Sequence, residues 1–138
     1  MLYEVENCPD SVSFEQLDSV ISFTLDALNF DCDGCLILTF DDELEAQQCG
    51  FFDFDEGENE LCISISPLLR GEEMVKTIMH ELVHAKQILT GQYVPGEGSI
   101  PGTWNGVMYT CDYIDLPWER EAYALEETLY GKYKSNVL

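Results

Sequence analysis

Residues 71–89 read GEEMVKTIMHELVHAKQIL, and the apolar side chains in this stretch recur at steps of three and four residues. Such spacing predicts an amphipathic helix, and Gly91 just beyond it is a typical C-terminal stop. At about 100° per residue, the apolar side chains gather on one side of the helix: Val75, Ile78, Met79, Leu82, Ala85 and Leu89. The opposite side carries Glu73, Thr77, His80, His84 and Gln87. The two histidines therefore lie away from the apolar face and point either to solvent or into a cleft.

The sequence around this helix predicts two more helices and several short strands. Apolar residues at helical spacing predict a helix over residues 13–29, and a last helix over 117–133 has Pro117 in its favoured first turn. Continuous or alternating apolar residues predict strands over 35–40, 51–54 and 60–66. Residues 41–48 are acidic and predict a short helix or a loop.

The order of these elements indicates the fold class. Residues 91–106 are rich in glycine and proline, which predicts an irregular loop or a broken hairpin, and residues 107–114 predict an extended segment. Helix, strands, helix, loop and helix in this order are typical of an α+β fold. We expect one domain over residues 1–138, built on a short, mostly antiparallel sheet.

The charge of the chain narrows the class of partner. Acidic residues number 27 against 6 basic ones, for a net charge of −21. This charge repels phosphate groups and anionic lipid headgroups, so we expect neither a nucleic acid nor a membrane as partner. The first residues lack the pattern of a signal peptide, and no apolar run approaches the roughly 20 residues of a membrane helix. We expect a cytoplasmic protein.

The two histidines of the chain stand in the motif His80-Glu81-Leu82-Val83-His84, which is HExxH. A spacing of four places both imidazoles on one helix face, where they can share a Zn²⁺ ion. Glu81 lies about 100° round from His80, close enough to act on a water at the metal. Zinc makes such a water acidic, and a carboxylate beside it acts as general base in attack on a carbonyl.

The third metal ligand must be a cysteine, a tyrosine or a carboxylate, because the chain has no third histidine. The helix over 117–133 carries several glutamates beside an apolar stripe of Trp118, Ala122, Leu125 and Leu129. Glu121 borders this stripe, Glu126 flanks its other side, and Glu119 and Glu127 lie further round. A carboxylate against an apolar face needs a compensating charge, and a metal ion provides one.

HELVH followed by a downstream Glu-Ala on a helix resembles the zincin metallopeptidases, specifically the gluzincins. The size and the order of elements resemble the small gluzincin-like or SprT-like peptidases of microbes and phages, over about residues 60–133. The resemblance implies a peptidase, an endopeptidase rather than an exopeptidase, with His80, His84 and Glu121 as zinc ligands. Gluzincins often have an aspartate four residues after the ligand glutamate, but Leu125 stands there, so the role of orienting a histidine passes to Glu126 or another acid.

A zinc peptidase also needs a donor to the developing oxyanion. Tyr109, Tyr113 and Tyr123 lie in or beside the segment between the expected ligands and are the candidates. Trp104-Asn105-Gly106 predicts a turn or part of an edge strand that aligns a peptide.

Three hypotheses follow from these features. The first is a zinc peptidase that acts on basic or unstructured polypeptides. The second is an acidic mimic or inhibitor that fills a basic groove on another protein, and the third is a zincin that binds metal without turnover. Cys32-Asp-Gly-Cys35 is a CxxC without a second pair at zinc-ribbon spacing, and it predicts a turn rather than a zinc or redox site.

Overall fold

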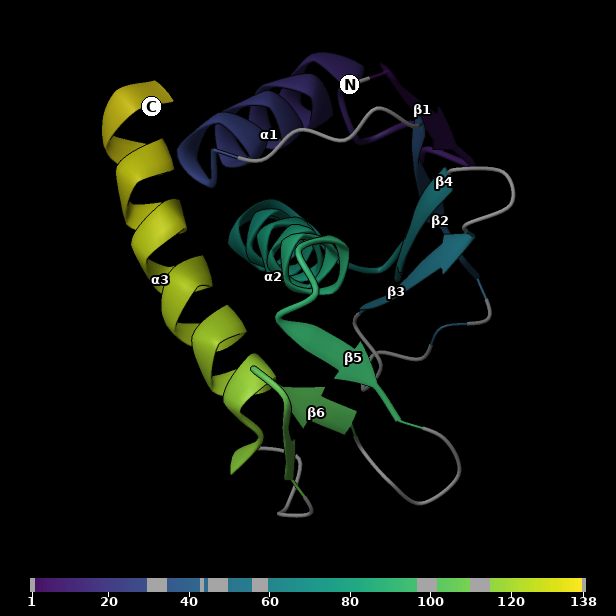
Figure 1. Ribbon diagram of the computed structural model, residues 1–138. Coiled ribbons are helices and arrows are strands. Elements are labelled where there is room, and N and C mark those ends of the chain that lie inside the picture. The colour runs from purple at the N-terminus through teal and green to yellow at the C-terminus, as the bar shows by residue number, and fades with distance from the viewer. Residues whose placement is uncertain are drawn as a thin grey trace.

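The computed structural model describes residues 2–29, 35–42, 44, 50–55, 60–96, 102–109 and 115–137. Helix α2 spans Gly71–Leu89, the range that the sequence predicts, and occupies the centre of the molecule (Figure 1). Helix α1 (Phe14–Ala27) and helix α3 (Pro117–Val137) lie beside it, and a sheet covers a third side. Because neighbours enclose α2, eleven of its residues are buried, including polar ones.

The main sheet has four strands: β1 (Leu2–Glu6), β2 (Cys35–Phe40), β3 (Gly50–Asp55) and β4 (Glu60–Ile65). Their order is β1-β2-β4-β3, with β1–β2 and β2–β4 parallel and β3–β4 antiparallel. The α+β class is confirmed, but the expectation of a mostly antiparallel sheet is wrong for this sheet. The sequence analysis missed β1, and α1 between β1 and β2 is the crossover that a parallel pair requires.

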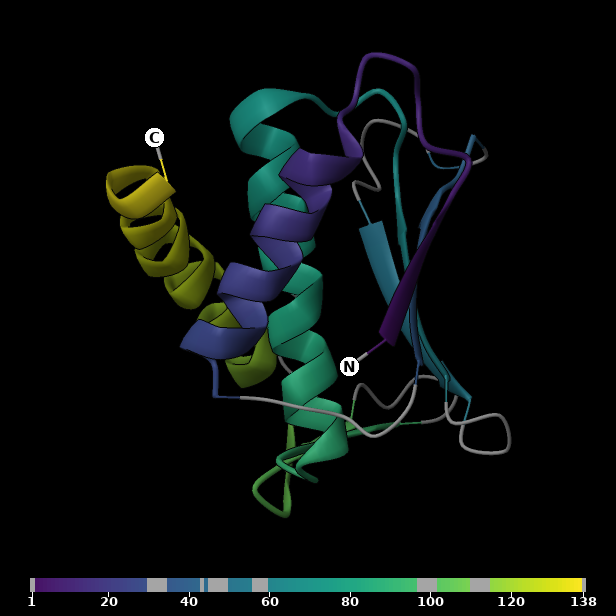
Figure 2. The same cartoon turned by 90° about the horizontal axis from the view of Figure 1, so that it is seen from above.

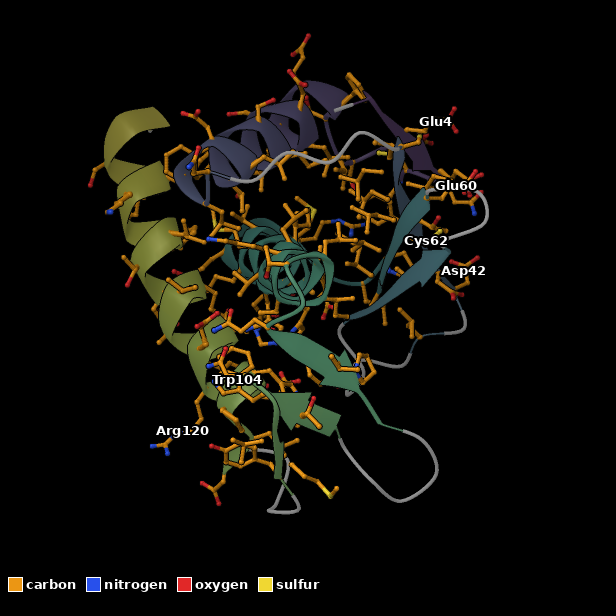
Figure 3. The ribbon with its side chains drawn as sticks, viewed as in Figure 1. Glu4, Asp42, Glu60, Cys62, Trp104 and Arg120 are labelled. Atoms are coloured by element: carbon orange, nitrogen blue, oxygen red, sulfur yellow. The ribbon has the colours of Figure 1, made fainter. Side chains whose placement is uncertain are left out.

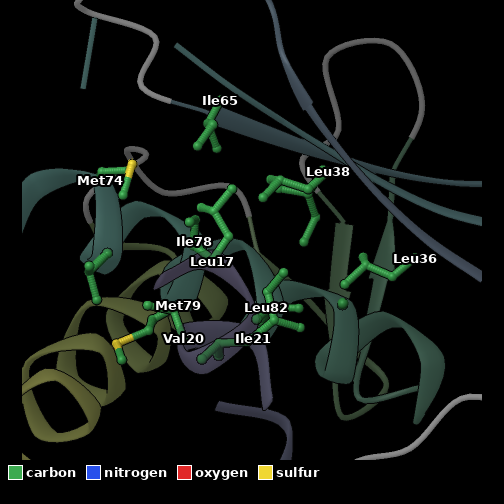
Figure 4. Packing of buried hydrophobic residues seen from close by; sticks show 14 of the residues in the cluster. Leu17, Val20, Ile21, Leu36, Leu38, Ile65, Met74, Ile78, Met79 and Leu82 are labelled. Carbon is green, nitrogen blue, oxygen red and sulfur yellow. The ribbon is translucent and has the colours of Figure 1, made fainter. Parts of the chain in front are cut away.

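The three helices of the described residues lie on one side of the main sheet (Figure 2). Side chains alternate between buried and half-exposed along β2 and β4, so every second one faces the helices. These side chains join apolar residues of α1 and α2 in one core (Figure 4), which includes Leu17, Ile21, Leu36, Leu38, Ile65, Ile78 and Leu82. At roughly 1.5–3 kcal/mol for each large apolar side chain, this core holds α2 in place and so positions its polar side.

A second, antiparallel sheet lies below the end of α2 (Figure 1) and joins strands β5 (Tyr93–Pro95), β6 (Gly102–Trp104) and β7 (Val107–Tyr109). The sequence predicts a loop or a broken hairpin for most of this region. Gly102 has a φ of 144°, and a Cβ there would lie 2.5 Å from the carbonyl oxygen of Val94. The ring of Tyr93 stacks on Trp118 with a centroid distance of 4.2 Å. This contact ties the second sheet to the start of α3.

Some sequence predictions fall outside the described residues. They are most of the segment 41–48, Cys32 of the Cys32–Cys35 pair, and Tyr113. None of the described helices is both long and apolar enough to cross a membrane.

Candidate metal centre

His80 and His84 lie on the side of α2 that faces α3, and both are buried, with exposed fractions of 7% and 8%. Their rings meet edge to face, and the two Nε2 atoms are 3.1 Å apart. The sequence alone did not decide whether this face points to solvent or into a cleft. The first turns of α3 cover it instead, because the stacked Tyr93 and Trp118 hold the start of that helix against α2.

Glu119 of α3 completes a triad with the two histidines. Its Oε1 atom lies 3.0 Å from Nε2 of His80 and 3.1 Å from Nε2 of His84. The three atoms therefore form a nearly equilateral triangle. A tetrahedral zinc ion with ligand distances of 2.0–2.1 Å separates its ligand atoms by about 3.3 Å. The residues present fit a metal ion, and the buried group of His80, His84 and Glu119 is able to bind one.

The third member of this group differs from the residue expected from the sequence. Glu121 is two residues from Glu119, which is about 200° round the helix, and its carboxylate accepts a hydrogen bond of 3.1 Å from Nε2 of Gln87. Glu119 and Glu126 are seven residues apart, almost two full turns, and so share one face of α3. The prediction of Glu121 came from its place beside the apolar stripe of this helix. The signal for Glu119 is a pair of glutamates at a spacing of seven, opposite two histidines at a spacing of four.

Each imidazole also has an acceptor on its Nδ1 atom. Nδ1 of His80 lies 2.9 Å from Glu126 Oε1, and Nδ1 of His84 lies 2.8 Å from Gln87 Oε1. Ionised carboxylates and amide oxygens only accept hydrogen bonds, so both Nδ1 atoms donate, and neutral imidazoles then carry their lone pairs on Nε2. The sequence predicts that Glu126 or another acid orients a histidine, because Leu125 stands where gluzincins often have an aspartate. Glu126 is the acid that contacts Nδ1 of His80.

The carboxylates of the cluster favour a positive charge on or between the histidines. Burial lowers the pKa of His80, but hydrogen bonds to Glu119 and Glu126 outweigh it and raise the pKa to about 9. Burial raises the pKa of Glu119, but its hydrogen bonds to the two histidines outweigh this and lower it to about 2. In the absence of a metal, protons shared with the carboxylates supply the charge.

Glu81 stands beside the triad on α2 and is buried, with an exposed fraction of 6%. Burial raises the pKa of its carboxyl, while the charges of His84 and His80 oppose that shift. A carboxylate with a raised pKa accepts a proton more readily near neutral pH. Glu81 is therefore a candidate general base, on its place in the motif and its raised pKa.

Of the tyrosines expected as oxyanion donors, the structure describes Tyr109 and Tyr123. The ring of Tyr123 lies against His80, with centroids 4.6 Å apart, and is 46% exposed. Tyr109 is half-buried at the end of β7. The sequence analysis missed Tyr93, whose pKa is raised by burial and by the charge of Glu119. Neither arginine is placed as a donor to the oxyanion. Arg120 is exposed and points away from the molecule (Figure 3). Arg70, just before α2, donates a hydrogen bond to Ser11.

Comparison with known proteins assigns the chain to no family. No protein-family model, no curated protein and no solved structure matches the chain. The resemblance to the gluzincins therefore stays a prediction from the HELVH motif and the Glu-Ala pair that follows it in the sequence.

Proposed function

We propose that this protein is a zinc-dependent peptidase. The observation that carries the proposal is the convergence of three acceptor atoms, Nε2 of His80, Nε2 of His84 and Oε1 of Glu119, within 3.1 Å of one another. Where both imidazoles are neutral and donate through Nδ1, these three atoms are all acceptors, so a proton or a metal ion must lie among them. The buried Glu81 next to this group would act as the base beside the bound metal.

The donor set favours zinc in a catalytic role. Two imidazoles and one carboxylate form a known ligand set of catalytic zinc, whereas structural zinc has four protein ligands. The triad offers three protein atoms, and the outer partners Glu126 and Gln87 are engaged with Nδ1 atoms. Hydrogen bonds of this kind fix the orientation of ligating histidines and raise their basicity.

In the proposed reaction, zinc activates the water, and side chains of this protein transfer the proton and stabilise the carbonyl oxygen. When bound, zinc supplies a Lewis acid that makes a water molecule acidic near neutral pH. The Glu81 carboxylate would take a proton from the water as the water oxygen bonds to the carbonyl carbon, and would then give this proton to the amine nitrogen as the C–N bond breaks. Tyr123 is the candidate donor to the carbonyl oxygen, because its ring contacts a ligand and its side chain is partly exposed. The net charge of −21 favours basic or unstructured polypeptides as substrates.

Metal analysis combined with a peptidase assay tests the proposal. We expect about one zinc per chain and hydrolysis of unstructured peptides rich in lysine and arginine. Glu81→Gln keeps the shape of the side chain but removes the base, so we expect full zinc content and a loss of about 10²–10⁴ in rate. The matched control is Glu73→Gln, on the exposed first turn of the same helix.

Two outcomes contradict the proposal. Folded wild-type protein that takes up no zinc removes the metal centre. Zinc-loaded wild-type protein without hydrolysis of any peptide tested leaves a metal-binding protein without turnover, the third hypothesis from the sequence.

A further inference from the structure

We propose that Gln87 is a positioning residue that holds two of the three ligands, His84 and Glu119, in place at once. This inference rests on the metal centre of the proposed function. Gln87 lies one helical turn beyond His84 on α2 and is 1% exposed. A buried amide is costly unless its hydrogen bonds are made, and here the structure shows three of them.

The hydrogen bonds of Gln87 join α2 to the start of α3. Its Oε1 atom lies 2.8 Å from Nδ1 of His84. Its Nε2 atom donates to the carbonyl oxygen of Trp118 at 3.0 Å and to Oε1 of Glu121 at 3.1 Å. One side chain therefore contacts an imidazole of one helix and the backbone of the other.

These partners determine which way the amide faces. The Trp118 carbonyl and the Glu121 carboxylate are acceptors, so the NH₂ group must face them. The amide oxygen is then left for His84, and Nδ1 of His84 must donate to it. A neutral imidazole held in this way carries its lone pair on Nε2, the atom that faces Glu119. Gln87 thus selects the tautomer of His84 that can bind a metal.

The same amide also fixes the position of Glu119. The Trp118 carbonyl belongs to the peptide bond that joins Trp118 to Glu119, so a hydrogen bond to it holds the backbone next to the ligand. The Trp118 side chain is 2% exposed and stacks on Tyr93, which anchors this residue from another direction. Rotation of α3 by one residue would move Glu119 by about 100° and separate it from the histidines.

The other imidazole is held differently, which gives an internal control. Nδ1 of His80 donates to the Glu126 carboxylate of α3 and has no hydrogen bond with Gln87 among the described residues. Loss of Gln87 should therefore affect His84 and leave the hydrogen bond of His80 intact.

Zinc titration and nitrogen–proton NMR correlation of the rings test this inference on the full chain. With two histidines there are four ring nitrogens, so each signal can be assigned. In Gln87→Met we expect zinc affinity to fall by about 10–100-fold and the His84 Nδ1–H signal to exchange rapidly with water. The His80 Nδ1–H signal should persist. In Glu126→Met the His80 Nδ1–H signal should exchange rapidly with water and the His84 Nδ1–H signal should persist. Gln16→Met, on the exposed start of α1, should change neither signal.

Gln87→Glu separates the two parts of the role. The carboxylate keeps an acceptor for Nδ1 of His84 but has no NH₂ group for the Trp118 carbonyl. We expect a retained His84 Nδ1–H signal together with weakened zinc binding, because the lost hold on the Trp118 carbonyl outweighs the basicity that a carboxylate adds to His84. Should Gln87→Met fail to fold, this variant carries the test.

Two results overturn the inference. One is a folded Gln87→Met protein whose zinc affinity stays within threefold of wild type. The other is a folded Gln87→Met protein with reduced zinc affinity in which both Nδ1–H signals remain unchanged, because a purely structural cross-link would give that result. A wild-type protein that binds no zinc overturns the proposed function instead, whereas wild-type zinc binding with an unaffected Gln87→Met variant overturns this inference alone.

Discussion

The two sides of helix α2 are buried to a similar degree but carry opposite chemistry. One side places Ile78 and Leu82, both 0% exposed, in the apolar core. The other side places His80 and His84, at 7% and 8% exposure, against carboxylates of α3. Burial on the first side stabilises the fold through the hydrophobic effect. Burial on the second side removes ionisable groups from water, which costs free energy unless they find partners.

The difference places the group that could bind a metal ion on the polar side of α2. Among the described residues, the buried histidines and carboxylates are two histidines and three glutamates, and no buried residue is a lysine or an arginine. Such a cluster lacks positive charge until protons or a cation enter it. The apolar side of α2 needs no charge, whereas the polar side holds acidic groups without a buried lysine or arginine among the described residues to balance them.

Removal of the third ligand should have the largest effect on the polar side. We expect Glu119→Ala to abolish zinc binding, because two imidazoles without a carboxylate leave too few ligands. Glu121→Ala, two residues away on the same helix, should retain most of the zinc. Elemental analysis of both proteins after gel filtration checks this. If Glu121→Ala loses the metal and Glu119→Ala keeps it, the ligand expected from the sequence is the right one.

Truncation on the apolar side should reduce stability rather than metal binding. Leu82→Ala leaves a cavity in the core, and we expect the free energy of unfolding to fall by about 2–5 kcal/mol. Leu68→Ala is the matched control, because Leu68 is 73% exposed and such a change stays within about 0.5 kcal/mol. Urea unfolding of the metal-free proteins gives both values. Equal effects at the two positions would contradict the packing described here.

The stability of the metal-free protein should depend on pH through the polar side. The pKa of His80 rises from 6.5 to about 9 on folding. A raised pKa means that the folded state binds the proton more tightly, so its stabilisation is full below about pH 6.5 and disappears as the pH passes 9. We expect urea midpoints to fall across this window. His80→Gln should flatten the profile, and an unchanged slope in that variant would assign the effect to another group.

The smallest change should come from the partner of His80. Glu126→Gln keeps an acceptor for Nδ1 but removes the negative charge, so the imidazole becomes less basic. We expect zinc affinity to fall by about tenfold to 100-fold, with the triad otherwise intact. Competition with a coloured chelator measures this. An unchanged affinity would show that Glu126 does not support the ligand that it contacts.

Much of the fold follows from local sequence patterns. The ends of α2 match the prediction because apolar spacing and Gly91 define them within a single segment. Strand β2 matches its predicted range for the same reason. Strand β1 was missed because Leu2–Glu6 contains two glutamates and becomes a strand through pairing with β2, a contact distant in sequence.

The group that could bind a metal ion was predictable on one helix and not on the other. The spacing of HExxH places His80 and His84 on one face of α2, so their closeness follows from the sequence alone, whereas the role of Glu81 stays a prediction. The choice between Glu119 and Glu121 depends on how α3 is rotated about its axis. That rotation is set by tertiary contacts, among them the stacking of Trp118 on Tyr93, which no local pattern contains.

The enclosure of α2 has a consequence for motion. A helix covered by α1, α3 and both sheets cannot unravel without displacing its neighbours. Its backbone amides should therefore exchange with heavy water only when the whole molecule opens, while those of Lys134 and Ser135, exposed beyond the buried Tyr133, exchange on a shorter timescale. Entry and exit of an ion would then require the start of α3 to swing outward while the histidine-bearing helix stays rigid.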